Sequence, residues 1–360
     1  MKTVFRLNDL RKKMKESSLD GVLIFSRNNC NYISGFSGSN GYVFVTLNEL
    51  YLVTDYRYID QARKQIEDCN IIPITKDFSC FIKILSEIRD KNHSNSMINI
   101  GFESDHISFT KFSDLKYCVG DKVSLKPIKD LIESIRAIKD LDEINILSKS
   151  VELADNVMAE VMNNLQPGMT ELEISNTIDL CILHLNGEGV SFPSIVATGL
   201  NSAFPHHKPT EEIIKNGDSL IIDMGVLYRG YRSDISRTVF VGENKDSKFS
   251  EIYSVVLGAQ QAAYEMATPG IKGGYLDNIA REFIKSKGYG DYFTHGLGHG
   301  VGLDIHEKPM IISSSKDSID IGAVFTIEPG IYIPNWGGVR IEDIYVMEEN
   351  GSKVLTQSPK

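Results

Sequence analysis

Histidine and acidic side chains, the residue types that bind metal ions, are concentrated in the second half of the chain. His295, His299 and His306 stand in one stretch and are separated by glycines, although the whole chain has only 8 histidines. Imidazole binds metal ions or carries protons near neutral pH, and glycine lets a backbone come close to a bound group. Because glycine-rich loops also contain histidines by chance, the acidic residues elsewhere in this half decide how the stretch is interpreted.

Four acidic residues stand next to runs that predict strands. Asp223 ends an apolar run, and Asp234 lies just before another, with a hairpin-type Tyr-Arg-Gly-Tyr turn at 228–231 between them. A hairpin would bring Asp223 and Asp234 close together. Glu328 and Glu342 repeat this arrangement further along the chain. We therefore expect four carboxylates on paired strands within apolar surroundings.

Four buried carboxylates require cations, because burying unpaired charges is prohibitive and their repulsion would force protonation. Two divalent ions would solve this problem, with His299 as the nitrogen ligand. The expected metal ligands are Asp223, Asp234, His299, Glu328 and Glu342. This oxygen-rich set with one imidazole and no thiolate favours Mn²⁺, Co²⁺, Fe²⁺ or Zn²⁺ over a structural zinc site, and the histidine disfavours calcium.

The composition excludes several classes of partner. The net charge of −10 leaves no basic excess to neutralise a nucleic acid, and the apolar fraction of 42% is ordinary for a globular protein. The first residues contain no apolar signal segment, and no run of about eighteen apolar residues predicts a membrane span. The five cysteines show no paired spacing and are interpreted as reduced thiols. We expect a cytoplasmic protein without nucleic-acid or membrane partners.

The first 130 residues alternate helical and strand patterns, which predicts an α/β domain. The periodicity predicts strands at 21–25, 51–54, 71–74 and 97–102, and helices within 4–14, 58–65 and 81–88. The glycine-containing segment 35–41 is interpreted as a surface turn. We place a domain at 1–130, a linker at 131–139 and a second domain at 140–360.

A long amphipathic helix opens the second domain. Asp140 and Glu143 have the spacing of an N-terminal capping box, and apolar residues then recur at helical spacing. A Pro-Gly pair at 167–168 ends this helix, and another at 269–270 ends a helix predicted over 249–267. A duplicated helix-and-strand unit, with one acidic residue delivered by each copy, explains this repetition.

The C-terminal half resembles the metallopeptidases of the pita-bread fold, a family that includes methionine aminopeptidase, aminopeptidase P and prolidase. The five expected ligands match its five-ligand motif in order and spacing, and the resemblance covers roughly 140–350. The first 130 residues resemble the creatinase/prolidase-type N-terminal domain, notably at 32–38 and 54–62. The resemblance implies an α/β N-terminal domain followed by an α+β pita-bread catalytic domain. The presence of this N-terminal domain points to the Xaa-Pro peptidases within the family.

The resemblance also implies roles for residues outside the ligand set. His206 matches the family's substrate-site histidine, and His295 and His306 match the two histidines that flank the ligand histidine. Tyr332 and Arg340 match residues that line the site. We accordingly expect substrate binding from His295, Tyr332 and Arg340, and a catalytic contribution from His206 and His306.

The mechanism that the resemblance implies is metal-assisted hydrolysis. Two divalent ions per subunit, Mn²⁺ foremost, would activate a bridging water for attack on the carbonyl before proline. Glu328 could also shuttle the proton, while His306 or His206 would stabilise the oxyanion. The expected substrates are small peptides with proline at the second position, and the expected assembly is a homodimer.

Other functions on the same fold remain as alternatives. A creatinase-like, metal-free hydrolase or a non-catalytic binding protein would have lost ligands, and here all five are present. A methionine aminopeptidase would not need the N-terminal domain. The sequence does not separate an Xaa-Pro dipeptidase from an Xaa-Pro aminopeptidase, and we lean slightly to the former.

Overall fold

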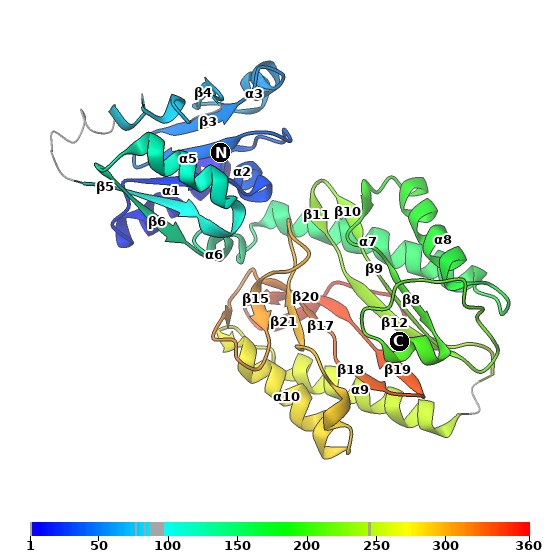
Figure 1. Ribbon diagram of the computed structural model, residues 1–360. Helices are drawn as coiled ribbons and strands as arrows, with labels where there is room; N and C mark the ends of the chain where they lie inside the picture. The colour runs from blue at the N-terminus through cyan, green and yellow to red at the C-terminus, as the bar shows by residue number, and fades with distance from the viewer. Residues whose placement is uncertain (1, 76–77, 83, 87–96, 244–245) are drawn as a thin grey trace. The chain divides into compact units, whose positions relative to one another are not determined.

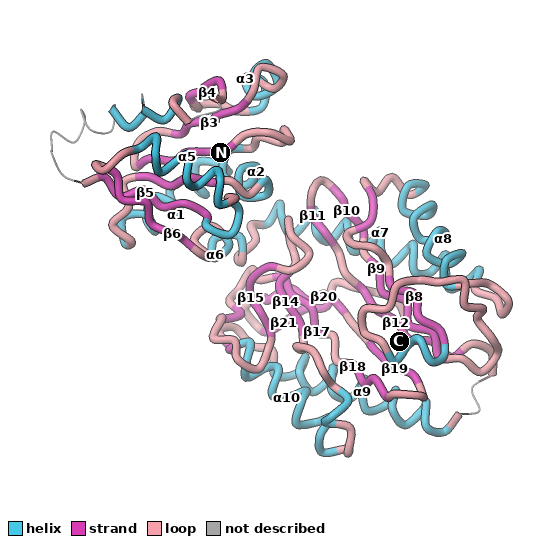
Figure 2. Tube along the Cα trace, viewed as in Figure 1, coloured by secondary structure: helices cyan, strands magenta, loops and turns pink. Residues whose placement is uncertain are grey.

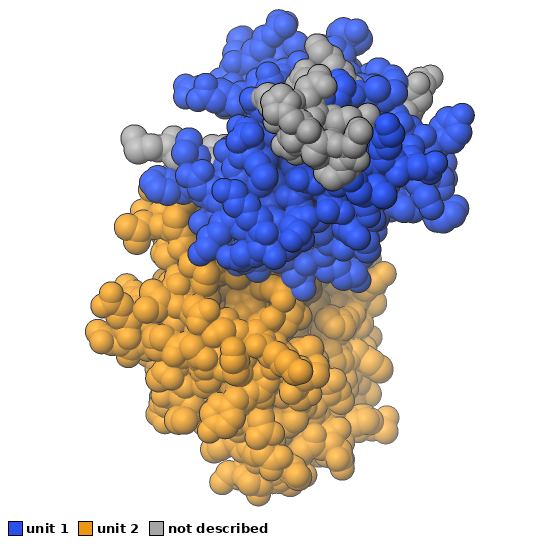
Figure 3. All heavy atoms as spheres, turned by 90° about the vertical axis from the view of Figure 1, so that its left-hand side faces the viewer, with its two compact units in different colours: residues 1–135 blue, residues 136–360 orange. Residues whose placement is uncertain are grey.

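The computed structural model describes the chain apart from residues 1, 76–77, 83, 87–96 and 244–245 (Figure 1). The chain forms two compact units, residues 1–135 and residues 136–360 (Figure 3). Among the described residues, no helix combines the length and apolar character that crossing a membrane requires.

Unit 1 is built on a six-stranded mixed sheet in the order β4-β3-β2-β1-β5-β6. Its elements are α1 (Lys2–Glu16), β1 (Gly21–Ile24), α2 (Arg27–Ser34), β2 (Tyr42–Thr46), β3 (Leu50–Thr54), α3 (Ile59–Gln65), β4 (Asn70–Pro73), β5 (Ile98–Glu103), α5 (Phe109–Val119), β6 (Val123–Ile128) and α6 (Glu133–Arg136). Strand β1 pairs antiparallel with β2 and parallel with β5, as expected for an α/β unit with one hairpin. The predicted helix over 81–88 falls partly outside the described residues.

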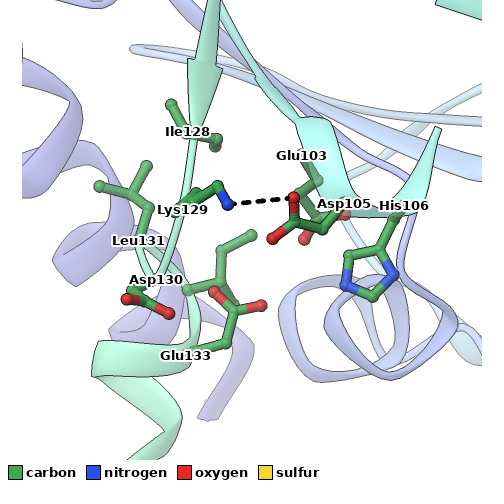
Figure 4. A pocket seen from close by; sticks show the side chains of 9 residues that line it. Glu103, Asp105, His106, Ile128, Lys129, Asp130, Leu131 and Glu133 are labelled. Atoms are coloured by element: carbon green, nitrogen blue, oxygen red, sulfur yellow. Dashed lines mark ion pairs between the residues drawn. The ribbon is translucent and has the colours of Figure 1, made fainter. Parts of the chain in front are cut away.

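A cavity of about 180 Å³ lies beside the ends of β5 and β6, with an acidic lining (Figure 4). Its buried member, Glu103, accepts hydrogen bonds from the backbone N–H groups of Phe25 and Ser26 at 2.6 and 2.7 Å and from Asn29 Nδ2 at 2.5 Å. The carboxylate of Glu103 therefore holds the turn between β1 and α2, so its charge serves the fold of unit 1.

Unit 2 contains two antiparallel sheets that carry the predicted site, β12-β9-β8 and β15-β14-β17-β20-β21. Its elements are α7 (Leu141–Asn164), α8 (Glu171–His184), β7 (Gly189–Val190), β8 (Ile195–Thr198), β9 (Ser219–Met224), β10 (Val226–Tyr228), β11 (Tyr231–Arg232), β12 (Ile235–Phe240), α9 (Ser247–Met266), β13 (Ile271–Lys272), α10 (Gly273–Ser286), β14 (Gly298–Gly300), β15 (Glu307–Ile311), β16 (Ser318–Ile319), β17 (Val324–Ile327), β18 (Gly330–Ile333), β19 (Gly337–Arg340), β20 (Asp343–Glu348) and β21 (Gly351–Val354). Figure 2 shows helices α7 to α10 around these strands.

The two halves of unit 2 repeat one plan. Helix α7 begins at the predicted Asp140–Glu143 capping box, and the next helix, α8, follows the first Pro-Gly pair. In the same way, helix α9 precedes the second Pro-Gly pair and helix α10 follows it. Side chains of α7 and α8 form one core with β9 and β12, and side chains of α9 and α10 form another with β17 and β20. Each helix pair thus supports one sheet of the site.

The predicted hairpin places the first two acidic residues. Arg229 and Gly230 both have positive φ, 49° and 80°, which is the backbone of a type I′ turn between β10 and β11. Asp223 in β9 lies opposite Ser236 in β12, so Asp234, just before β12, is brought alongside β9. Strands β17 and β20 repeat this pairing, with Ile327 opposite Asp343, and bring Glu328 and Glu342 together.

Candidate metal centre

Three of the predicted ligands form a tight buried group. Asp234, His299 and Glu342 each offer an atom within 4.8 Å of the other two, and each side chain is buried. Asp234 directly precedes β12, His299 lies in β14 and Glu342 directly precedes β20, strands that Figure 2 shows in the middle of unit 2. The sequence analysis predicted all three as ligands, and the fold brings them together from distant parts of the chain.

The other two predicted ligands border this group. His299 Nε2 lies 3.3 Å from Glu328 Oε1 and 3.6 Å from Asp234 Oδ2. Its Nδ1 contacts Gly300 O at 3.1 Å, so Nε2 is the nitrogen that faces the carboxylates. Asp223 Oδ2 accepts a hydrogen bond from Arg340 Nη2 at 2.6 Å. All five predicted ligands therefore lie at one place.

The glycines around His299 serve close strand packing. A Cβ atom at Gly298 would lie 2.2 Å from Thr326 O, and a Cβ atom at Gly300 would lie 2.1 Å from Lys308 O. Side chains at these positions would push β14 away from β17 on one side and from β15 on the other. The absence of side chains at Gly298 and Gly300 thus lets the strand that carries His299 pack closely between its two neighbours.

The donor set fits divalent cations. Asp223 Oδ1, Asp234 Oδ1 and Glu342 Oε1 are buried and have no hydrogen-bond partner within the part of the chain that the structure describes. Buried carboxylate oxygens without partners are strongly unfavourable, and cations would satisfy them. Oxygen ligands with one imidazole suit first-row divalent ions.

Burial and mutual repulsion dominate the electrostatics of these acids. Burial, followed by the charges of neighbouring carboxylates, raises the pKa of Asp234 and of Glu342 well above the usual range. Burial also raises the pKa of Asp223, although the charge of Arg340 opposes it. For Glu328 burial acts in the same direction, but the hydrogen bond and charge of His299 outweigh it and hold the pKa low. The metal-free site therefore resists full ionisation.

The metal-free protein is expected to lose thermal stability as the pH rises from about 5 to 8. Asp234 and Glu342 have folded-state pKa values above those of the unfolded chain, so the folded state binds more protons in this range and stability falls with pH. His299 acts with the same sign, because Glu328 raises its pKa against the effect of burial, and that stabilisation is lost as the pH rises through the folded pKa. The lowered pKa of Glu328 has the opposite sign, but its contribution is lost only in more acidic solution. The lowered pKa values of His295 and His306 also have the opposite sign and make the fall in stability shallower below about pH 7, so the loss is expected to be steepest above that pH.

Thermal unfolding in EDTA at pH 5, 6, 7 and 8 checks this expectation. An Asp234→Asn, Glu342→Gln double variant is the control, since it should show a flatter dependence. A Tm of the wild-type protein that rises steadily from pH 5 to pH 8 would contradict it.

A hydrogen-bonded chain of side chains leads from the ligands to His295. Arg340 donates from Nη1 to the hydroxyl of Tyr332 at 2.8 Å, and that hydroxyl lies 2.9 Å from His295 Nε2. Arg340 Nε donates to Ser236 Oγ at 2.9 Å, and Ser236 donates to Glu342 Oε2 at 2.8 Å. The three residues for which substrate binding was predicted are therefore connected to one another and to the predicted ligands Asp223 and Glu342.

The predicted catalytic histidines, His306 and His206, lie near His295 and His299. The ring of His306 meets the ring of His299 edge to face, with 4.3 Å between centroids. Burial lowers the pKa of both His295 and His306, and the charge of nearby His206 acts in the same direction. The fold thus gathers all the predicted site histidines. Their roles in binding and catalysis stay predictions.

Two buried acidic residues at this site were missed in the sequence. Glu171 accepts hydrogen bonds from Thr198 N, Asn201 Nδ2 and Thr210 N at 2.8 to 3.0 Å, and it contacts His207 Nε2 at 2.8 Å. It therefore fixes the loop that carries His206, and His207 belongs to this anchor. Glu307, next to His306, pairs with the buried cations Arg136 and Lys139. Neither set of contacts can be predicted from a local sequence pattern, because the partners are distant in sequence.

Comparisons with known proteins agree with this geometry. The model of metallopeptidase family M24 matches residues 145–349, and the model of the creatinase/prolidase N-terminal domain matches residues 6–138. The chain is 39% identical over 357 residues to a protein named Xaa-Pro dipeptidase from Pyrococcus furiosus, which covers 99% of this chain and 98% of the relative.

Solved structures match along nearly the whole chain. A Xaa-Pro dipeptidase from Bacillus anthracis superposes with a TM-score of 0.92 at 35% identity and covers 99% of this chain and 98% of its own. An X-Pro aminopeptidase from Thermotoga maritima gives 0.85 at 34% identity, with 97% and 98% covered. These matches confirm the predicted fold class, a creatinase/prolidase-type N-terminal domain followed by a pita-bread catalytic domain. The chain belongs to metallopeptidase family M24 and is a hydrolase of that family.

Proposed function

We propose that this protein hydrolyses the peptide bond before proline in Xaa-Pro dipeptides and requires two divalent metal ions. The observation that carries the proposal is the buried group of carboxylates around His299, in which three oxygens lack partners among the described residues. The names of the relatives support the substrate class, since proteins called Xaa-Pro dipeptidase match along the full chain.

The residues that would hold the metal ions are Asp223, Asp234, His299, Glu328 and Glu342. Mn²⁺ is the ion we expect first, with Co²⁺, Fe²⁺ and Zn²⁺ as alternatives. When bound, such ions would supply an activated water and polarise the scissile carbonyl. They would also neutralise the carboxylates, whose ionisation burial and mutual repulsion oppose.

The chain's own residues would move the protons. The pKa of Glu328 is low, because His299 outweighs the effect of burial, so its carboxylate is ionised near neutral pH and can accept a proton at Oε1 or Oε2. Burial lowers the pKa of His306, which leaves its imidazole neutral at pH 7 and able to donate an N–H to a developing oxyanion. His206 is proposed as the alternative donor to that oxyanion.

Substrate recognition would use the chain from Arg340 to His295. The guanidinium of Arg340 and the hydroxyl of Tyr332 are fixed by their mutual hydrogen bond, so they can orient a polar group of a small peptide without reorganising. A proline nitrogen in the scissile bond carries no N–H and proline fixes the backbone, so the cleft needs no acceptor for that position.

The substrate class is tested by a panel of three peptides, Ala-Pro, Ala-Pro-Ala and Met-Ala, with the metal-stripped protein reloaded with Mn²⁺. We expect Ala-Pro to be cleaved at least tenfold faster than the other two, measured as kcat/KM. The second candidate, an Xaa-Pro aminopeptidase, is favoured by the match to the Thermotoga maritima structure, and faster cleavage of Ala-Pro-Ala would support it. Preference for Met-Ala would overturn both.

A cytoplasmic location and a homodimeric state complete the proposal. The absence of a membrane-spanning helix among the described residues is compatible with the first. Sedimentation of the purified protein at several concentrations would measure the second, and a monomer at every concentration would overturn it.

A further inference from the structure

One buried amide lies behind both glutamate ligands. Gln260 of α9 is 1% exposed, and its Nε2 donates to Ile327 O at 3.0 Å and to Ile341 O at 3.4 Å. Ile327 directly precedes Glu328, and Ile341 directly precedes Glu342. A single NH₂ group therefore connects the two peptide bonds from which the two predicted glutamate ligands start.

The orientation of this amide is fixed from two sides. Gln260 Nε2 also lies 3.1 Å from Asp343 Oδ2. Lys360 Nζ donates to Gln260 Oε1 at 2.8 Å and pairs with Asp343 Oδ2 at 2.5 Å. Since an ammonium group can only donate, the oxygen of the amide must point to Lys360 and the nitrogen to the carbonyls. The amide cannot turn over without losing these contacts.

Arg237 also holds the backbone around Glu342. Its Nη1 donates to Glu342 O at 2.6 Å, and its Nη2 donates to Asp343 Oδ1 at 2.8 Å. The peptide bonds before and after Glu342 are thus both held by buried side chains. The carbonyl before Glu328 accepts from Gln260, which adds a side-chain link between Glu328 and Glu342 to the pairing of β17 with β20.

We propose that Gln260 is a positioning residue for the metal centre, which sets the spacing of Glu328 and Glu342. This inference rests on the proposed function, because it assumes that the two glutamates bind metal. Two carboxylates can share a pair of ions only if their oxygens are held at the right separation, and residues behind metal ligands supply this constraint. Gln260 would do so from helix α9, through the main-chain carbonyls that precede the two predicted ligands.

The test compares Gln260→Met, which keeps the length of the side chain but removes its donors, with the wild-type protein. The matched control is Gln261→Met, because Gln261 is the exposed neighbour on α9 and contacts only Glu265 in the contacts described. Isothermal titration of the metal-stripped proteins with Mn²⁺ gives affinity and stoichiometry. The visible spectrum of the Co²⁺-loaded proteins reports coordination geometry independently of activity.

We expect Gln260→Met to bind the weaker Mn²⁺ ion about 10- to 100-fold less tightly and to show an altered Co²⁺ spectrum, while Gln261→Met matches the wild type. Thermal unfolding in EDTA measures the effect on the fold alone. Wild-type affinity and an unchanged spectrum in Gln260→Met, with only a lower Tm, would show a merely structural role and overturn the inference. A wild-type protein that binds no Mn²⁺ would overturn the proposed function as well.

A second variant covers the case in which Gln260→Met does not fold. Lys360→Met leaves the donors of Gln260 in place but removes the group that orients its amide. We expect a weakening of Mn²⁺ affinity in the same direction but smaller, and Lys353→Met, which loses only an exposed pair with Glu348, serves as its control. Equal affinities in Lys360→Met and Lys353→Met would overturn the inference.

Discussion

Asp234→Asn is expected to abolish divalent metal binding and peptide hydrolysis together, while the metal-free chain stays folded. The carboxylate of Asp234 lies in the tight group with His299 and Glu342, and an amide in its place would offer one neutral oxygen where an anionic ligand is required. Activity should fall to the background rate. Mn²⁺ binding by isothermal titration and hydrolysis of Ala-Pro measure the two effects on the same protein.

The same substitution should stabilise the metal-free protein. Burial and the charge of Glu342 raise the pKa of Asp234, so ionising it in the folded state is unfavourable, and asparagine removes that charge. In EDTA at pH 8 we expect a Tm above that of the wild type. The control is Asp291→Asn, at an exposed acid next to the His295 stretch, which should change neither Mn²⁺ binding nor the Tm in EDTA. Two equivalents of Mn²⁺ bound to Asp234→Asn with wild-type affinity would refute the ligand assignment.

Glu307→Gln is expected to destabilise unit 2 by about 3–5 kcal/mol, since it would leave the buried ammonium of Lys139 without its carboxylate and would remove one of the two carboxylates that pair with Arg136. Lys139 Nζ lies 2.8 Å from Glu307 Oε1, and Arg136 donates to Oε2 of the same carboxylate. All three side chains are buried. Arg136 keeps a second partner in Asp304, at 2.8 Å, but Lys139 loses its only ion pair among the pairs described.

This loss should lower the Tm by roughly 10 °C, measured by thermal unfolding of the metal-free protein. Glu212→Gln is the matched control, because Glu212 pairs with Lys215 on the surface, where such pairs contribute less than about 1 kcal/mol. Similar Tm values for the two variants would contradict the role given to the buried pair. Glu307 directly follows His306. A lower kcat in Glu307→Gln would therefore also show that the ion pairs of Glu307 with Arg136 and Lys139 orient that histidine.

The parts of the fold that could be predicted are those with a local signal. Helix α7 carries its capping box in the sequence, and the hairpin before Asp234 carries an Arg-Gly turn with both residues at positive φ. The acidic residues could be proposed as ligands because an acid at the end of an apolar run is conspicuous, and because burial of several acids demands cations.

The missed elements have weak local signals. Helix α2, Arg27–Ser34, is short and rich in asparagine, and it depends on the side chain of Ser26, which accepts a hydrogen bond from Asn29 N. Strands β2 and β6 were also missed, although β2 lies between β1 and β3 in the sheet. These elements are stabilised by their neighbours in the sheet rather than by their own periodicity.

The missed site residues act across long sequence separations. Glu171 contacts residues 27 to 39 positions away, and Gln260 contacts residues 67 to 100 positions away. A buried glutamine on a helix looks the same in sequence as an exposed one, such as its neighbour Gln261. Only the packing of α9 against the strands distinguishes the two, and packing is a property of the fold.

The most direct test of the metal-dependent site is a titration of metal-stripped protein with Mn²⁺, in which bound metal and Ala-Pro hydrolysis are measured together. We predict no hydrolysis without metal, two ions bound per chain at saturation, and a rate that rises with occupancy of the site. The Asp234→Asn protein should stay at zero throughout. Hydrolysis that persists at the full rate after the metal is removed, or saturation without any bound Mn²⁺, would contradict a metal centre built from the residues around His299.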